Sequence, residues 1–141
     1  MSRIYWDTML FIYLLEDHPV FSPRVQQILD RAYRRGDALF TSFLALGEVM
    51  AGAEKTATPS KALAIRTTID EMGFSYLPFD NGAVTPFSTL RAIQKIKVAD
   101  SIHLACAASA GIDLFLTGDQ KLTRLDVPGI QFIADFNNPL F

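Results

Sequence analysis

The sequence has little cysteine, little net charge and no long uncharged segment. Its single cysteine, Cys106, excludes an internal disulfide bond and suits a reducing compartment. Thirteen basic and fifteen acidic residues give a formal net charge of -2, which does not favour nucleic-acid binding, although a local basic strip is compatible with it. The longest segment without Asp, Glu, Lys or Arg runs from Ser101 to Ile112, and Asp7 interrupts the apolar N-terminal segment. We therefore expect no membrane span and no secretory signal, but a soluble cytoplasmic protein.

Apolar and aromatic residues, by contrast, are abundant. Of the 141 residues, 50% are hydrophobic and 11% aromatic, whereas 20% are charged. A chain of this length buries about two-thirds of its unfolded surface when it folds, which is enough for a hydrophobic core. The composition excludes a disordered chain and predicts a single domain that spans residues 1–141.

Strand and helix patterns alternate along the chain. Runs of apolar and β-branched residues predict strands at 3–6, 38–42, 75–79, 113–117 and 130–134. Helical spacing and capping signals predict helices at 9–16, from Ser22 as N-cap toward Gly36, at 43–53, at 59–71, through Pro86 to about Lys95, from Asp100 as N-cap to Gly111, and at 119–125. The polar segment 54–60 predicts a loop. This alternation implies an α/β fold, in which a central parallel sheet of about five strands is covered by helices on both faces.

Acidic residues stand where predicted strands end. Asp7 follows the first strand, Asp119 follows the fourth, and Asp100 opens the helix that leads into the fourth. In an open parallel sheet, ligands bind beyond the carboxyl ends of the strands, so these three side chains are expected to converge. Glu48 lies in an apolar stretch of the helix after the second strand, where a buried carboxylate needs a partner or a metal ion.

Together the four carboxylates predict a metal site. Each one alone has a simple structural explanation, as a helix cap, a strand end or a solvated charge. Carboxylates that are brought together raise one another's pKa, and a hard cation such as Mg²⁺ or Mn²⁺ relieves that repulsion.

Four short motifs occur in the order and in the structural contexts of a known family. They are Asp7-Thr8 after the first strand, Glu48 in TSFLALGEV, Asp100 in ADSIHLACAA and Thr117-Gly118-Asp119 after the fourth strand. With these motifs the chain, over nearly its whole length, resembles the PIN-domain family of metal-dependent ribonucleases, in particular the toxins of VapBC-type toxin–antitoxin pairs.

The resemblance implies an endoribonuclease that hydrolyses RNA and leaves a 5′-phosphate and a 3′-hydroxyl. It implies that Mg²⁺ or Mn²⁺ is held by the four acids, Asp7, Glu48, Asp100 and Asp119, and activates a water for in-line attack. Thr8 and Thr117 are then expected to orient carboxylates or waters. The substrate is expected to be single-stranded RNA or an RNA loop, and the expected protein partners are a small antitoxin and a second copy of the chain.

Several residues near the motifs have two possible roles. Four basic residues are candidate phosphate contacts or ordinary solvated charges: Lys95, Lys97, Lys121 and Arg124. His103 lies one helical turn after Asp100, but a histidine in an apolar run is more often a core residue, so it is left out of the catalytic set. Apolar residues of the first two helices are candidate partner contacts or core residues: Phe11, Tyr13, Leu14 and Val25.

Two other functions remain open. One is a different Mg²⁺-dependent phosphate-transfer enzyme, although enzymes with an aspartyl nucleophile usually carry two Asp residues after the first strand and this chain has only Asp7. The other is a non-catalytic RNA-binding or protein-binding module of the same fold, for which one or more of the four acids would be expected to be missing. Because all four are present, catalysis is the preferred interpretation.

Overall fold

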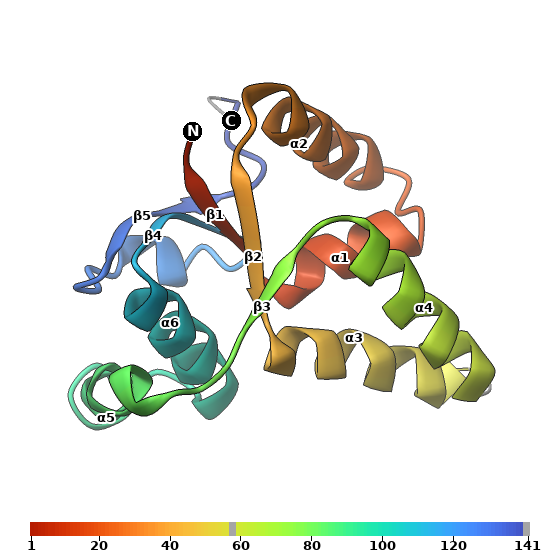
Figure 1. Ribbon diagram of the computed structural model, residues 1–141. Coiled ribbons are helices and arrows are strands. Elements are labelled where there is room, and N and C mark those ends of the chain that lie inside the picture. The colour runs from red at the N-terminus through yellow and green to blue at the C-terminus, as the bar shows by residue number, and fades with distance from the viewer. Residues whose placement is uncertain (57–58, 140–141) are drawn as a thin grey trace.

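A computed structural model describes residues 1–56 and 59–139 of the protein (Figure 1). Its centre is a five-stranded sheet in the order β3-β2-β1-β4-β5, and every neighbouring pair is parallel. The strands are β1 (Arg3–Trp6), β2 (Ala38–Ser42), β3 (Ser75–Leu77), β4 (Ile112–Thr117) and β5 (Ile130–Asp135). The predicted α/β class, the parallel sheet and its five strands are confirmed.

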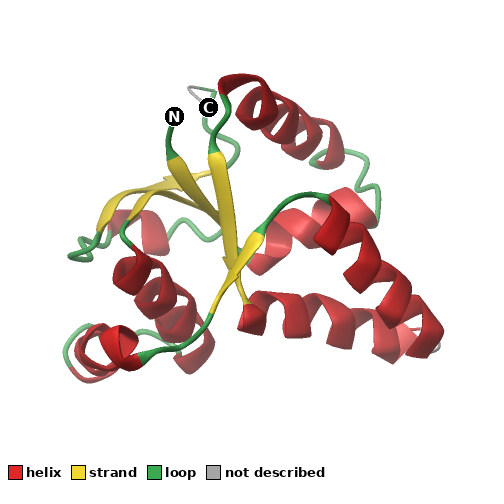
Figure 2. Ribbon diagram, viewed as in Figure 1, coloured by secondary structure: helices red, strands yellow, loops and turns green. Residues whose placement is uncertain are grey.

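Helices cover both faces of the sheet (Figure 2). They are α1 (Thr8–Leu15), α2 (Ser22–Arg35), α3 (Phe43–Thr56), α4 (Pro59–Glu71), α5 (Val84–Ala92) and α6 (Val98–Ala110), with short 3₁₀ turns at η1 (Asn81–Ala83) and η2 (Leu122–Arg124). The first four helices lie on one side of the sheet, and α5 and α6 lie on the other (Figure 1). Within the described residues, no helix is both long enough and apolar enough to cross a membrane.

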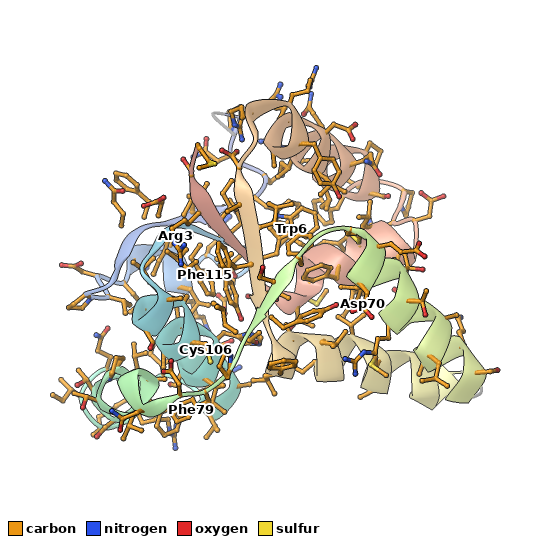
Figure 3. All side chains as sticks on the ribbon, in the orientation of Figure 1. Arg3, Trp6, Asp70, Phe79, Cys106 and Phe115 are labelled. Carbon is orange, nitrogen blue, oxygen red and sulfur yellow. The ribbon has the colours of Figure 1, made fainter. Side chains whose placement is uncertain are left out.

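Alternation of side chains along the strands explains why both faces are covered. In β1, Ile4 and Trp6 pack into the core under α1 and α2, whereas Tyr5 packs into the core under α6. Figure 3 shows Trp6 and Phe115 on opposite sides of the sheet. Because successive side chains of a strand point to opposite faces, a strand that is apolar throughout requires cover on both sides.

The order of the strands determines where a ligand can bind. From β1 the sheet extends through β2 to β3 on one side, and through β4 to β5 on the other. The chain connections therefore diverge between β1 and β4, and a crevice forms beyond the carboxyl ends of these two strands. The backbone N–H of Asp7 donates to the carbonyl of Leu116 at 3.0 Å, so Asp7 lies at this point.

Two predicted helix starts are wrong by a few residues. Helix α6 begins at Val98 with Lys97 as its N-cap, so Asp100 belongs to the first helical turn and is not the cap. Helix α2 includes Ser22, and its N-cap is Phe21 without a side-chain hydrogen bond. In both cases the helix begins before the residue with the best capping side chain, so the modest capping preference does not by itself determine where a helix starts.

Other element boundaries also differ from the predictions. Helix α3 continues to Thr56, into the segment predicted as a loop, while Thr58 lies outside the described residues. Only η2 forms in the predicted helix 119–125. Helix α5 tolerates Pro86 because this residue lies in the first turn, where backbone N–H groups lack intrahelical acceptors. It ends at Ala92 instead of Lys95, which has a φ of +56°.

A glycine fixes the contact between α6 and the turn before β5. Gly129 has a φ of +101°, and a Cβ atom there would lie 2.5 Å from the carbonyl oxygen of Ala108. Gly36, by contrast, has a φ of +71° and no atom within 4 Å of such a Cβ. The two positions share a left-handed backbone but differ in the space around them.

We expect Gly129→Ala to lower the free energy of unfolding by about 3 kcal/mol, because it combines a strained backbone with a collision against α6. Gly36→Ala is the control and should cost about 1 kcal/mol, the conformational term alone. Urea unfolding of both variants measures the difference. Equal losses would show that α6 and this turn are not in close contact.

Candidate active site

The four predicted acids line one cavity. It has a volume of about 450 Å³ and lies at the carboxyl ends of β1 and β4. Its lining comes from the start of α1, from α3, from the first turns of α6 and from the loop after β4: Asp7, Thr8, Met9, Ile12, Glu48, Lys97, Ala99, Asp100, His103, Gly118 and Asp119. Segments far apart in the sequence therefore bring Asp7, Glu48, Asp100 and Asp119 together.

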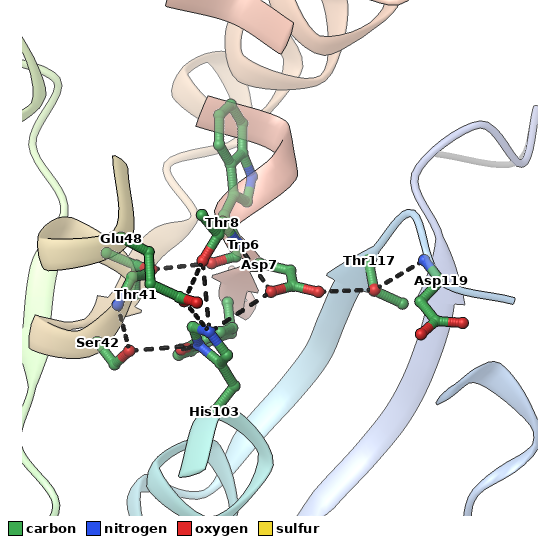
Figure 4. Close-up of polar contacts among 11 residues, drawn as sticks. Trp6, Asp7, Thr8, Thr41, Ser42, Glu48, His103, Thr117 and Asp119 are labelled. Carbon is green, nitrogen blue, oxygen red and sulfur yellow. Dashed lines mark hydrogen bonds and ion pairs between the residues drawn. The ribbon is translucent and has the colours of Figure 1, made fainter. Parts of the chain in front are cut away.

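Asp7 is held by hydrogen bonds to both of its carboxylate oxygens. It is the N-cap of α1, and its Oδ1 accepts from the backbone N–H of Thr8 at 2.8 Å. Its Oδ2 accepts from the hydroxyl of Thr117 at 2.8 Å (Figure 4). The side chain is largely buried, since Asp7 is only 8% exposed. Its orientation is thus fixed before any ligand arrives.

Thr117 joins the first and last acids of the site. Besides donating to Asp7, its hydroxyl oxygen accepts from the backbone N–H of Asp119 at 3.0 Å. The carboxylate of Asp119 in turn accepts from the backbone N–H of Lys121 at 2.9 Å. Thr117 is fully buried, so this hydroxyl is a structural link and not a turn residue in solvent.

Glu48 projects from α3 and is held through one oxygen. Its Oε1 accepts from the hydroxyl of Thr8 at 2.8 Å and from Nε2 of His103 at 2.7 Å. The hydrogen bond from His103 lowers the pKa of Glu48 most, burial opposes it, and the bond from Thr8 lowers it further. The expected orienting contact of Thr8 is therefore present, and its target is Glu48.

His103 is part of the site, although the sequence interpretation left it out. The residue is only 2% exposed, as expected of a core histidine, yet its Nε2 also lies 3.8 Å from Oδ1 of Asp7. On its other side, Nδ1 lies 2.7 Å from the hydroxyl of Tyr5. The only signal in the sequence was its position three residues after Asp100, which places both side chains on the same helix face.

Burial and neighbouring negative charges both act on Asp100. Burial raises the pKa of this carboxyl most, and the negative charges of Asp7 and Asp119 raise it further. His103 and Lys97 oppose the increase. The ionised carboxylate is therefore less stable here than in water, and a nearby cation would stabilise it.

The chemistry of these donors fits a hard divalent cation. Carboxylate oxygens are the preferred ligands of Mg²⁺ and Mn²⁺, and the raised pKa of Asp100 reports uncompensated negative charge. In residues 1–56 and 59–139, however, no group of three Asp, Glu, His or Cys side chains already has the geometry of a metal site. Side-chain adjustment must accompany binding.

Of the four basic residues predicted near the site, one reaches the cavity. Lys97 contributes to its lining and acts electrostatically on Asp100. Lys95, Lys121 and Arg124 are exposed and do not line the cavity.

A second, largely apolar groove lies beside the site. It has a volume of about 690 Å³ and is formed by α1, α3 and α4: Ile12, Leu15, Glu16, Val49, Gly52, Lys61, Ala64, Ile65 and Thr68. Ile12 also lines the acidic cavity, so the two depressions adjoin. Of the two roles left open for the apolar residues of the first helices, Phe11 and Val25 have the core role, because both are buried, while Tyr13 and Leu14 are partly buried against the same core.

Comparison with known proteins identifies the family. The model of the PIN domain matches residues 4–128, so this chain belongs to the PIN-domain family, as the motifs indicated. No curated protein matches the sequence significantly.

Solved structures of toxin–antitoxin complexes share the fold. The chain is similar to VapBC2 from Rickettsia felis, bound to a DNA fragment from its promoter, with 17% identity, a TM-score of 0.75 and coverage of 94% of this chain and 98% of that chain. It is also similar to DNA-bound VapBC from Salmonella typhimurium, with 22% identity, a TM-score of 0.72 and coverage of 96% and 99%. For VapBC-5 from Mycobacterium tuberculosis the identity is 22%, the TM-score 0.66 and the coverage 96% and 99%.

We expect Asp100→Asn to raise the melting temperature by a few degrees at pH 7 in EDTA, because it removes the repulsion that raises the pKa of Asp100. Since that pKa is higher in the folded than in the unfolded chain, ionisation destabilises the fold above it. The gain should therefore shrink as the pH falls through the pKa of Asp100 and the native carboxyl becomes protonated.

Thermal scans at several pH values in EDTA test this expectation. Asp126→Asn, at an exposed position outside the cavity, removes the same charge and should change the melting temperature little. A fall in stability of Asp100→Asn at pH 7 would mean that Asp100 has a stabilising structural role instead.

Proposed function

We propose that this protein is a metal-dependent endoribonuclease and the toxin of a toxin–antitoxin pair. Its membership of the PIN-domain family supports a nuclease. The observation that carries the proposal is the gathering of Asp7, Asp100 and Asp119 at one cavity, where burial and then the charges of Asp7 and Asp119 raise the pKa of Asp100. Repulsion between carboxylates does not stabilise the fold, so a bound cation is the most direct explanation for the gathering of these acids.

The metal ligands in this proposal are the four predicted acids, Asp7, Glu48, Asp100 and Asp119, and the ion is Mg²⁺ or Mn²⁺. When bound, the ion supplies a water of lowered pKa and stabilises negative charge on the scissile phosphate. The chain contributes orientation: Thr117 and the backbone of Thr8 hold Asp7, while the Thr8 hydroxyl holds Glu48.

The substrate in this proposal is single-stranded RNA or an RNA loop. Asp7 is largely buried at the bottom of the site, so a phosphate within a regular duplex would be held away from it. Lys97 at the cavity offers a counter-charge to a phosphate next to the scissile one. Lys95, Lys121 and Arg124 are exposed and suit phosphates further along the strand.

We expect the purified chain to cleave a mixed RNA pool in Mg²⁺ or Mn²⁺ and to be inactive in excess EDTA. Asp100→Asn keeps the shape of the side chain but removes its charge. We expect this variant to cleave RNA at least about 100-fold more slowly, because loss of a group that directly stabilises the reacting charges has an effect of this size. Gel analysis of end-labelled RNA measures the rate.

The control is Asp126→Asn, which changes the same charge outside the cavity and should cleave at the wild-type rate. Equal cleavage by wild type and Asp100→Asn would indicate a contaminating nuclease or a wrong site. Metal binding without cleavage of RNA would favour another Mg²⁺-dependent phosphate-transfer enzyme. Neither binding nor cleavage would favour the non-catalytic module.

The partner in this proposal is a small antitoxin that lies in the groove of α1, α3 and α4. The similar solved structures are toxin–antitoxin complexes, which supports a partner of this kind. The groove is lined mainly by apolar side chains, with Glu16 and Lys61 among them, so it suits an amphipathic segment. Because Ile12 belongs to both depressions, an occupant of the groove would also restrict access to the acids. The homodimer and the cytoplasmic location remain predictions.

We expect Ala64→Arg to abolish co-purification with the product of a small open reading frame next to the gene, because it places a large charged side chain in the groove. Thr67→Arg, on exposed α4 outside the groove lining, is the matched control and should retain the partner. Loss of the partner in both variants, or in neither, would place the antitoxin elsewhere.

A further inference from the structure

Three buried polar side chains lie behind the acidic cavity. Tyr5 of β1 is fully buried, Ser42 at the end of β2 is 1% exposed, and His103 of α6 is 2% exposed. They come from three elements and meet within a layer that is otherwise apolar. Since burial of an unpaired polar group is costly, each of these side chains must have its hydrogen bonds satisfied by the others.

The position of one proton in this cluster follows from Glu48. An ionised carboxylate can only accept hydrogen bonds, and Oε1 of Glu48 lies 2.7 Å from Nε2 of His103. Nε2 must therefore carry a hydrogen and donate it to Glu48. The remaining ring nitrogen, Nδ1, faces away from the cavity.

The partner of Nδ1 is Tyr5. The phenol hydroxyl lies 2.7 Å from Nδ1, and burial raises the pKa of Tyr5 well above its usual value, so the phenol keeps its proton. The hydroxyl of Ser42 lies further away, at 3.4 Å, and accepts from the backbone N–H of Ala45. The Tyr5 hydroxyl is thus the nearest partner of Nδ1, while Nε2 carries the hydrogen that Glu48 accepts.

Tyr5 is a rigid anchor for this arrangement. Its ring stacks on Phe115 of the neighbouring strand, with centroids 4.7 Å apart and planes inclined by 7°. Both residues lie in the centre of the sheet, where β1 pairs with β4. A hydroxyl fixed in this way determines the rotation of the His103 ring.

Glu48 depends on such support more than the aspartates do. Its side chain has one more rotatable bond than Asp7, which is held at both oxygens by Thr8 and Thr117. In the described part of the chain, the two hydrogen bonds that Glu48 accepts both go to Oε1. Oε2 is thereby left for a ligand in the cavity.

We infer that Tyr5 and His103 are positioning residues for Glu48: the Tyr5 hydroxyl is hydrogen-bonded to Nδ1 of His103, and Nε2–H of His103 holds Oε1 of Glu48 so that Oε2 is left for a ligand in the cavity. This inference rests on the proposed function for the identity of the ligand, but the hydrogen-bond arrangement exists without it. Tyr5 lies behind the cavity and acts through His103, whose Nε2 is nearer to Glu48, at 2.7 Å, than to Asp7, at 3.8 Å.

Nitrogen NMR of the metal-free chain tests the arrangement directly. The sequence contains two histidines, so the imidazole spectrum of the ¹⁵N-labelled protein has two ring systems, and His18→Asn assigns them. We expect Nε2 of His103 to carry a hydrogen, and Tyr5→Phe to shift the Nδ1 resonance while Nε2 keeps its hydrogen. A bare Nε2 in the wild type, or an unchanged Nδ1 resonance in Tyr5→Phe, would overturn the inference.

Mn²⁺ binding tests the consequence for the site. Tyr5→Phe keeps the stacked ring and removes only the hydroxyl, and we expect it to weaken Mn²⁺ binding about tenfold in calorimetric titrations, as for the loss of other supporting hydrogen bonds. Tyr33→Phe is the matched control, because it removes a tyrosine hydrogen bond to the carbonyl of Met72 far from the cavity. It should bind Mn²⁺ as the wild type does.

The two readouts separate the inference from the proposed function. Wild-type affinity for Mn²⁺ in a folded Tyr5→Phe variant would overturn the positioning role, even if the protein cleaves RNA. Absence of Mn²⁺ binding by the wild type would overturn the proposed function and with it the role toward a cation. The nitrogen spectra would still decide the hydrogen-bond arrangement in that case.

Discussion

The concentration of negative charge at the carboxyl edge of β1 and β4 is the constraint on which the rest of the structure depends. Asp7, Asp100 and Asp119 repel one another there, as the raised pKa of Asp100 shows. The fold tolerates this because the strands that carry the acids are among the most deeply buried parts of the molecule, with Trp6 and Leu116 fully enclosed. Hydrophobic packing on both faces of the sheet thus stabilises a site that is unfavourable in itself.

Hydroxyl and imidazole groups hold these carboxylates in position without neutralising their charge. Thr117 donates to Asp7, and Thr8 and His103 donate to Glu48. Each contact fixes the direction of a carboxylate while leaving its charge in place, unlike a salt bridge with Lys or Arg, which would compete with a cation for the same oxygens. The acids are therefore oriented and still available for binding.

Much of this fold follows from local patterns in the sequence. Apolar runs such as those around Tyr5 and Phe115 identify buried parallel strands, and acids directly after them point to the ligand-binding edge. Glu48 stood out only through its apolar neighbours in the helix after β2, and the family resemblance supported its place in the site. The exact start of α6 was not predictable, since the helix begins at Val98 although Asp100 has the better side chain for a cap.

The parts of the site that the sequence did not predict depend on contacts between residues far apart in the chain. His103 has the surroundings of an ordinary core histidine, and only the approach of Tyr5 from β1 and of Glu48 from α3 gives it a role. Whether Phe11 and Val25 belong to the surface or to the core stayed open for the same reason, because helical spacing does not reveal which side of a helix faces the sheet. The adjoining groove involves α4, and no motif linked that helix to the site.

The central position of β1 in the sheet also determines when the site can form during synthesis on the ribosome. The bond between Thr117 and Asp7 spans 110 residues, and β1 can pair with β4 only after β2, β3 and α1–α6 have been made. A nascent chain that ends before β4 possesses Asp7 and Glu48 but has no crevice between β1 and β4 to enclose a ligand. The geometry of the site thus delays its assembly until β4 has been synthesised.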